Sequence, residues 1–475
     1  MDQVVSEKGP IAILVVHGIG AQRRGETAGK LLAGLGRVER GLAAKGQDGV
    51  LTVGGQAVRL YEVYWADLLQ GDVTRGAFQL KELQSLSWFP FFNWRRGNYQ
   101  KGNYSILKLA WPCVALPIMN FFLLFAYYGA GFVANVVSSV MAKRGAPEND
   151  PAARPTVREV AKQSAKLTAL DRILDEYLGD IFSYVNSAGK AFDRDEHEPP
   201  VPSAIIDVYP RIIQRFHDQL VQAHADGCAA IQIVAHSLGT VVTYHALSRL
   251  QFESRNDEDA GAIRAASAKV QHLYTIGSPL EKIRFFWPRL MPEGVITLGG
   301  ENLRWDNFVS WFDPVAGMLQ KSIYSGALTN HRLLGGGFFR GHVVYEHSAV
   351  FLKTFTHGLI GRELPLERTR KERWQDLLLL VGETLVAPVA LVVLLMVGAA
   401  LYVMAAVLVP FVISLGLRLF LKPETWGRIE DTASFIFLGC ITLTFLITPI
   451  LRANRVHSLY WVRSSSESGA RGGNT

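Results

Sequence analysis

The sequence predicts an α/β domain built on a mostly parallel sheet, which membrane helices interrupt and follow. Three observations predict this architecture. Short apolar runs end at glycine-containing turns, and helical patterns alternate with these runs. In addition, no charged residue or histidine occurs between Lys108 and Lys143, between Glu383 and Arg418, or between Asp431 and Arg452. Alternating strands and helices are typical of parallel sheets. About 20 consecutive apolar residues are enough to cross a bilayer.

The strands are expected where apolar residues predominate, and only the first of them, residues 11–16, is an unbroken apolar run. They are residues 11–16 (IAILVV), 58–65 (VRLYEVYW), 231–236 (IQIVAH) and about 270–278 (VQHLYTIGS). Helices are expected at about 205–225 and 241–251, and also over 170–185, where apolar residues recur every three or four positions. This order places strands and helices in alternation around one core.

The composition narrows the class of protein. The chain has 475 residues, of which 49% are hydrophobic and 19% charged, so we expect neither disorder nor a fibrous repeat. The net charge of +7 is modest, and the basic residues gather beside the apolar stretches, so nucleic-acid binding is not expected. Cys113 and Cys440 lie inside apolar stretches, which leaves Cys228 without a partner and favours a reducing compartment. The start of the chain does not resemble a signal peptide.

The strongest chemical signal is the segment VAHSLGT at residues 234–240. It follows the pattern G-x-S-x-G with Ala235 in place of the first glycine. A tight turn of this kind between a strand and a helix exposes a strained serine, Ser237, and the backbone N–H of Leu238 faces the same point. The alternative is an ordinary buried turn whose serine caps the helix.

The segment VVHGIG, which follows the first strand, offers a second backbone donor. In acyl transfer, an N–H group of this loop, here that of Ile19, can stabilise the developing oxyanion. A dinucleotide fingerprint fails because Arg23 stands where the third glycine belongs. A plain turn at the end of a strand is the other alternative.

A nucleophilic serine needs a base and an acid, which follow it along the chain in this architecture. Asp313 in SWFDPVAG is the favoured acid and Asp306 the alternative. His342 is the favoured base, because it follows a glycine-rich loop, and His347 is the alternative. The H-x-x-x-E-H spacing at 342–347 does not fit a metal site, so no metal and no cofactor are expected.

Taken in order, the motifs HGIGAQRRGE, YEVYWADL, YLGDIFSYV, VAHSLGTVVTYHAL, TIGSPL, FDPVAG and GHVVYEHS resemble the α/β-hydrolase superfamily, and within it the lipase-like serine hydrolases. The resemblance covers roughly residues 10–65 and 170–355. It implies a triad of Ser237, Asp313 and His342, with the amides of Ile19 and Leu238 as the oxyanion hole. The chain departs from the usual pattern at Ala235 and in its apolar stretches, so no substrate is implied.

Because Ile19 and Ser237 must meet, the chain between them must cross a membrane an even number of times, if at all. The expected organisation is therefore a hydrolase core in two parts (1–108 and 143–365), a re-entrant or hairpin membrane insertion (109–142), C-terminal transmembrane helices (376–452) and a disordered tail (453–475). This arrangement predicts an integral membrane protein with its hydrolase domain on the cytoplasmic side, and leaves the number of C-terminal spans open.

The function expected from these observations is that of a membrane-anchored serine hydrolase that cleaves a lipid or another hydrophobic acyl ester, with membrane lipids as substrate and anchor. Thioester and amide substrates are left open, as is the oligomeric state. The alternative is a non-catalytic membrane scaffold that uses a hydrolase-like domain for binding.

Overall fold

The computed structural model describes most of the α/β part of the chain. The described residues are 9–19, 22–38, 50–70, 86–95, 208–252, 258–291, 303–311, 313, 315–333, 341–343 and 345–364, with scattered positions between 99 and 188 and between 374 and 451. The chain divides into two compact units: Met1–Gly76 with Glu176–Ala387, and Ala77–Asp175 with Pro388–Thr475. Helix α4 (Phe89–Arg95) belongs to the second unit. All other elements below belong to the first.

A seven-stranded sheet forms the centre of the first unit, with the strand order β2-β3-β1-β4-β5-β6-β7. Only the pair β2–β3 is antiparallel, and every other neighbouring pair is parallel. The strands are β1 (Ile11–Val16), β2 (Val50–Val53), β3 (Gln56–Val63), β4 (Ala230–His236), β5 (Val270–Ile276), β6 (Arg304–Ser310) and β7 (Ala327–Leu333). The predicted α/β class with a mostly parallel sheet is confirmed.

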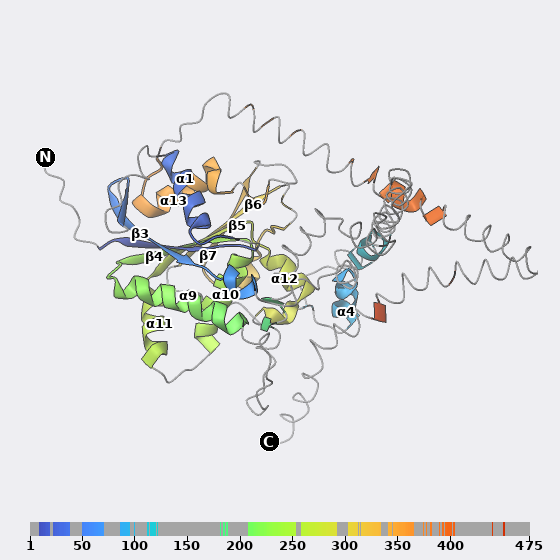
Figure 1. Ribbon diagram of the computed structural model, residues 1–475, viewed down its shortest axis with the longest axis horizontal. Coiled ribbons are helices and arrows are strands. Elements are labelled where there is room, and N and C mark those ends of the chain that lie inside the picture. The colour runs from blue at the N-terminus through green and yellow to red at the C-terminus, as the bar shows by residue number, and fades with distance from the viewer. Residues whose placement is uncertain are drawn as a thin grey trace, which may run out of the picture. The chain divides into compact units, whose positions relative to one another are not determined.

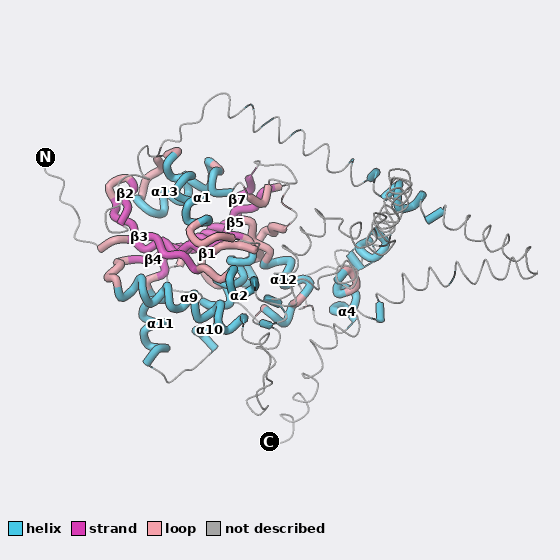
Figure 2. Tube along the Cα trace, in the orientation of Figure 1, coloured by secondary structure: helices cyan, strands magenta, loops and turns pink. Residues whose placement is uncertain are grey.

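Helices cover both faces of the sheet (Figures 1 and 2). Helices α9 (Val208–Ala225), α10 (Leu238–Phe252) and α11 (Glu258–Ala268) lie on one face, and α1 (Glu26–Gly36) and α13 (Ala349–Ile360) lie on the other. Helix α9 buries Ile212, Phe216 and Leu220 at four-residue spacing, which explains why this segment is an amphipathic helix. The shorter helices are α2 (Ala66–Gln70), α12 (Leu280–Phe286) and the 3₁₀ turns η5 (Pro288–Leu290), η6 (Lys321–Ile323) and η7 (Tyr345–His347).

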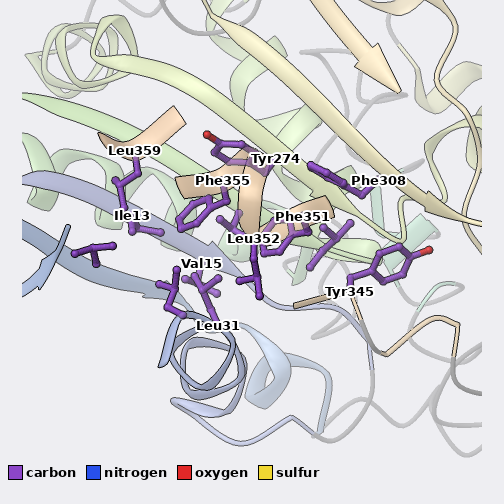
Figure 3. Packing of buried hydrophobic residues seen from close by; sticks show 14 of the residues in the cluster. Ile13, Val15, Leu31, Tyr274, Phe308, Tyr345, Phe351, Leu352, Phe355 and Leu359 are labelled. Carbon is purple, nitrogen blue, oxygen red and sulfur yellow. The ribbon is translucent and has the colours of Figure 1, made fainter. Parts of the chain in front are cut away.

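The hydrophobic core beneath α1 and α13 fixes the loop that precedes α13. Phe351 and Phe355 of α13 pack in one cluster with Ile13 and Val15 of β1, and Tyr345 belongs to the same cluster (Figure 3). All five side chains are fully buried. Because the hydroxyl oxygen of Tyr345 points away from the cluster in Figure 3, this residue connects the core to the ends of the strands.

The membrane part of the prediction is corrected by the structure. Among the described residues, no helix has both the length and the apolar character that crossing a bilayer requires, so the expected membrane insertion, C-terminal transmembrane helices and integral membrane localisation are not supported. A span needs about 20 mostly apolar residues. Helix α9, the longest described helix, has 18 residues and carries Arg211, Arg215 and Asp218. Most of the apolar stretches at 109–142, 384–417 and 432–451 lies outside the described residues, as does most of the expected helix at 170–185.

Candidate active site

Ser237 lies in the sharp turn between β4 and α10. Its φ angle of 53° is in the left-handed region, and it is the only non-glycine residue with a positive φ in the part of the chain that the structure describes. Such a conformation is costly for a residue with a side chain and is concentrated at functional sites. The backbone N–H of Ser237 donates to the carbonyl oxygen of Ile276 over 3.0 Å. The turn expected from the sequence pattern is present, and it places Ser237 at the carboxyl edge of the sheet.

Two glycines allow the chain to approach closely at this turn. A Cβ atom at Gly239 would lie 2.4 Å from the carbonyl oxygen of His17 and 2.7 Å from that of Val16, so any larger residue would collide with the end of β1. A Cβ atom at Gly18 would lie 2.7 Å from the Cβ atom of Ser237. The loop after β1 therefore lies directly against the serine.

His342 and Asp313 complete a hydrogen-bonded chain with this serine. The Ser237 hydroxyl lies 2.8 Å from His342 Nε2, and His342 Nδ1 lies 2.8 Å from Asp313 Oδ2. All three residues are buried, with 1%, 8% and 6% of their surface exposed for Ser237, His342 and Asp313. Since a carboxylate only accepts, Nδ1 carries the proton of a neutral His342, and the lone pair of Nε2 faces the serine hydroxyl. The structure thus brings together the serine, acid and base that were favoured from the sequence.

Asp313 is held in a carboxylate-binding loop. Its Oδ1 atom accepts hydrogen bonds from the backbone N–H groups of Val315 (2.7 Å) and Ala316 (3.1 Å), and its Oδ2 atom accepts one from the Tyr345 hydroxyl (2.6 Å) as well as that from His342. Burial alone would raise the pKa of Asp313, but these hydrogen bonds and the nearby imidazole together lower it to about 2. The carboxyl group is therefore charged at neutral pH.

The alternative acid and base occupy other places. Asp306 lies on β6 and accepts hydrogen bonds from His272 Nε2 and His331 Nε2, each over 2.6 Å. Burial raises the pKa of Asp306, but the two histidines outweigh it and lower the pKa to about 2. His347 lies at the end of η7. It is His342, and not these residues, that connects an aspartate to Ser237.

In the part of the chain that the structure describes, the backbone N–H groups of the two expected oxyanion donors, Ile19 and Leu238, make no hydrogen bond. Ile19 follows β1 by three residues, and Leu238 is the first residue of α10. The first N–H groups of a helix lack partners inside the helix, which explains why that of Leu238 is available to an oxygen atom of a ligand.

Three residues around the site were not assigned a role from the sequence. These residues are His17, His236 and Tyr345. The Nε2–H group of His236 donates to the carbonyl oxygen of His342 over 2.8 Å. Burial lowers the pKa of His236, which keeps its ring neutral. The motifs HGIG, AHSLG and GHVVYEHS contain all three, but the sequence does not reveal which atoms they contact. Among the described residues, no group of His, Cys, Asp and Glu is arranged to hold a metal ion.

Comparison of the chain with protein-family models, curated proteins and solved structures found no match.

Proposed function

We propose that this protein is a serine hydrolase that cleaves a carboxylic ester through an acyl-enzyme on Ser237. One observation carries the proposal: a serine in a strained turn donates a hydrogen bond to a histidine that a buried carboxylate orients. A serine that only capped a helix would need neither the histidine nor the carboxylate.

The proposed reaction has two halves. His342 Nε2 takes the proton from Ser237 Oγ as this oxygen attacks the ester carbonyl, and the backbone N–H groups of Ile19 and Leu238 stabilise the resulting oxyanion. His342 then gives its proton to the departing alcohol, which leaves the acyl group on Ser237. In the second half, His342 takes a proton from water, the hydroxide attacks the acyl carbon, and Ser237 recovers its proton as the acid departs. Asp313 stabilises the imidazolium in both halves.

We propose a carboxylic ester as the substrate and no particular acyl or alcohol group. A lipid substrate was expected because of the predicted membrane segments, and the described helices do not support those segments. The ester itself follows from the arrangement of nucleophile, base and amide donors, which is suited to acyl transfer.

The test compares the full-length chain with two serine variants. We expect a fluorophosphonate probe to label the wild type and Ser248→Ala, but not Ser237→Ala. Ser248 is the matched control, because it lies on α10, the helix that follows Ser237, where its hydroxyl donates to the carbonyl oxygen of His245. Hydrolysis of short p-nitrophenyl esters should fall by about four orders of magnitude or more in Ser237→Ala. Equal labelling of all three proteins, or no labelling of the wild type, would overturn the proposal and favour a binding role.

A further inference from the structure

His17 is a buried histidine beside the site to which the proposed reaction gives no role. Its exposed fraction is 1%, and its ring stacks on that of Trp65 with the centroids 4.5 Å apart. Both ring nitrogens are engaged. Nε2 lies 2.9 Å from the backbone nitrogen of Trp65 and 3.3 Å from that of Ala66, and Nδ1 lies 2.7 Å from the carbonyl oxygen of Gly18.

These partners determine which nitrogen of His17 carries the proton. Backbone N–H groups only donate, so Nε2 must present its lone pair to Trp65 and Ala66. A neutral ring then has its proton on Nδ1 and donates it to the Gly18 carbonyl oxygen, which only accepts. Burial lowers the pKa of His17 to about 4, so the ring stays neutral at physiological pH.

The hydrogen bond to Gly18 also fixes the next amide. The carbonyl of Gly18 and the N–H of Ile19 belong to one planar trans peptide unit, in which the C=O and N–H bonds point in opposite directions. When His17 holds the oxygen on its own side, the N–H of Ile19 must point to the other side. A rotation of this peptide would exchange the two groups.

The strand order indicates what lies on each side. Strand β1 lies between β3 and β4. The partners of the His17 ring, Trp65 and Ala66, follow β3, whereas Ser237 follows β4. The carbonyl of Gly18 is thus held toward the β3 side, and the N–H of Ile19 is directed toward the side of the serine, against which Gly18 already packs.

We propose that His17 is a positioning residue that presets the oxyanion hole by holding the Gly18–Ile19 peptide with its N–H toward the reacting carbonyl. This inference rests on the proposed hydrolase function. In the absence of the Nδ1–H donor, the peptide can rotate and present a carbonyl oxygen to the oxyanion, which repels it. His17 therefore stabilises the transition state and does not change the affinity for the ester.

Two amide variants separate this role from a structural one. His17→Asn places its amide near the position of Nδ1 and keeps a donor for Gly18, whereas His17→Gln places its amide near Nε2 and keeps an acceptor for Trp65. We expect kcat of His17→Gln to fall about 100-fold or more, with KM within about twofold of the wild type, as when one oxyanion donor is removed. We expect His17→Asn to stay within about fivefold of the wild-type kcat.

The affinity for a tetrahedral mimic gives a second readout. A trifluoromethyl ketone inhibitor should lose affinity in His17→Gln by the same factor as kcat/KM, because its adduct carries the oxyanion. Suppose that the wild type is labelled at Ser237. If His17→Asn and His17→Gln are then equally active, or if His17→Asn is the less active of the two, the proposed positioning role of His17 is wrong. If the wild type itself shows no labelling dependent on Ser237, the hydrolase function fails and this inference fails with it.

Discussion

Tyr345 shares one carboxylate oxygen of Asp313 with His342. The hydroxyl of Tyr345 donates to Oδ2 of Asp313 and accepts a hydrogen bond from the backbone N–H of Ser310 over 3.0 Å. Burial and the charge of Asp313 raise the pKa of this phenol well above its usual range. The phenol therefore stays protonated at neutral pH, and it donates to the same carboxylate oxygen that accepts the hydrogen bond of His342.

Replacement of this hydroxyl tests whether Tyr345 orients the acid. In Tyr345→Phe we expect kcat to fall about tenfold, because Asp313 loses one of its four donors and holds His342 less firmly. The acidic limb of the pH profile of kcat/KM should move to higher pH, because a carboxylate with fewer donors stabilises the imidazolium more strongly. The free energy of unfolding should fall by about 1–3 kcal/mol, since the N–H of Ser310 loses its buried acceptor.

The pH profile separates this role from a purely structural one. A variant that is merely less stable would show lower activity with an unchanged acidic limb. Fluorophosphonate labelling of Ser237 measures the concentration of active protein, so kcat can be calculated per active molecule.

At the scale of elements, the close contact between α10 and β1 determines whether the site can form. A Cβ atom at Gly239 meets two backbone oxygens, which cannot move aside as a flexible side chain would. We expect Gly239→Ala to lower the free energy of unfolding by about 1–3 kcal/mol through overpacking, and to reduce the rate of ester hydrolysis because the helix start shifts. Urea unfolding and the hydrolysis assay measure both effects.

Gly261 is the matched control for this substitution. It also lies inside a helix, α11, but nothing lies within 4 Å of the position of its missing Cβ atom. Gly261→Ala should raise the stability by about 0.5–1 kcal/mol, because alanine favours a helix over glycine. If both variants behave alike, the close approach of α10 to β1 does not limit the fold.

Three of the four predicted strands are largely apolar, whereas the fourth, β3, also carries Arg59 and Glu62. Strands β1, β4 and β5 are near-continuous apolar runs, as is typical of buried parallel strands. Strands β2, β6 and β7 were not predicted, and β6 and β7 carry polar residues that pair with each other across the sheet. Asn307 Nδ2 donates to Asn330 Oδ1 over 2.8 Å, and Asp306 binds His331. The pattern of apolar residues along the sequence does not indicate such polar pairs between strands.

Some residues of the candidate site can be predicted from their neighbours in the sequence, and others cannot. Ser237 and Leu238 belong to one local turn, whose small neighbours are visible in the sequence. The choice between Asp313 and Asp306, and the contacts of Tyr345 and His17, depend on which strand ends are neighbours in the sheet. The order of the strands in the sheet could not be predicted from the sequence alone.

For the whole molecule, we expect stability to fall with acid in two stages. Between pH 6.5 and about 4, an unfolded chain binds a proton at His17 that the folded protein excludes, so the free energy of unfolding decreases as the pH falls. For His17 alone this interval corresponds to about 3 kcal/mol. Above pH 3.8 the charged form of Asp313 contributes its full stabilisation to the fold, and this contribution is lost as the pH falls from 3.8 to about 2.

Urea unfolding of the wild type and His17→Asn at several pH values checks the first stage. The variant should show a shallower loss of stability between pH 6.5 and 4 and the same loss below pH 4, where the carboxylates titrate. Parallel curves for the two proteins over the upper interval would contradict the assignment of this stage to His17.

The central position of β1 in the sheet has a consequence for the order in which the protein is made. Strand β1 pairs with β3 on one side, but its other neighbour, β4, begins only at Ala230. A nascent chain that ends before this residue carries an apolar strand with one unpaired edge, which is a risk for aggregation. Since β4 also leads directly into Ser237, the strand that pairs with this edge during synthesis is the one that positions the proposed nucleophile.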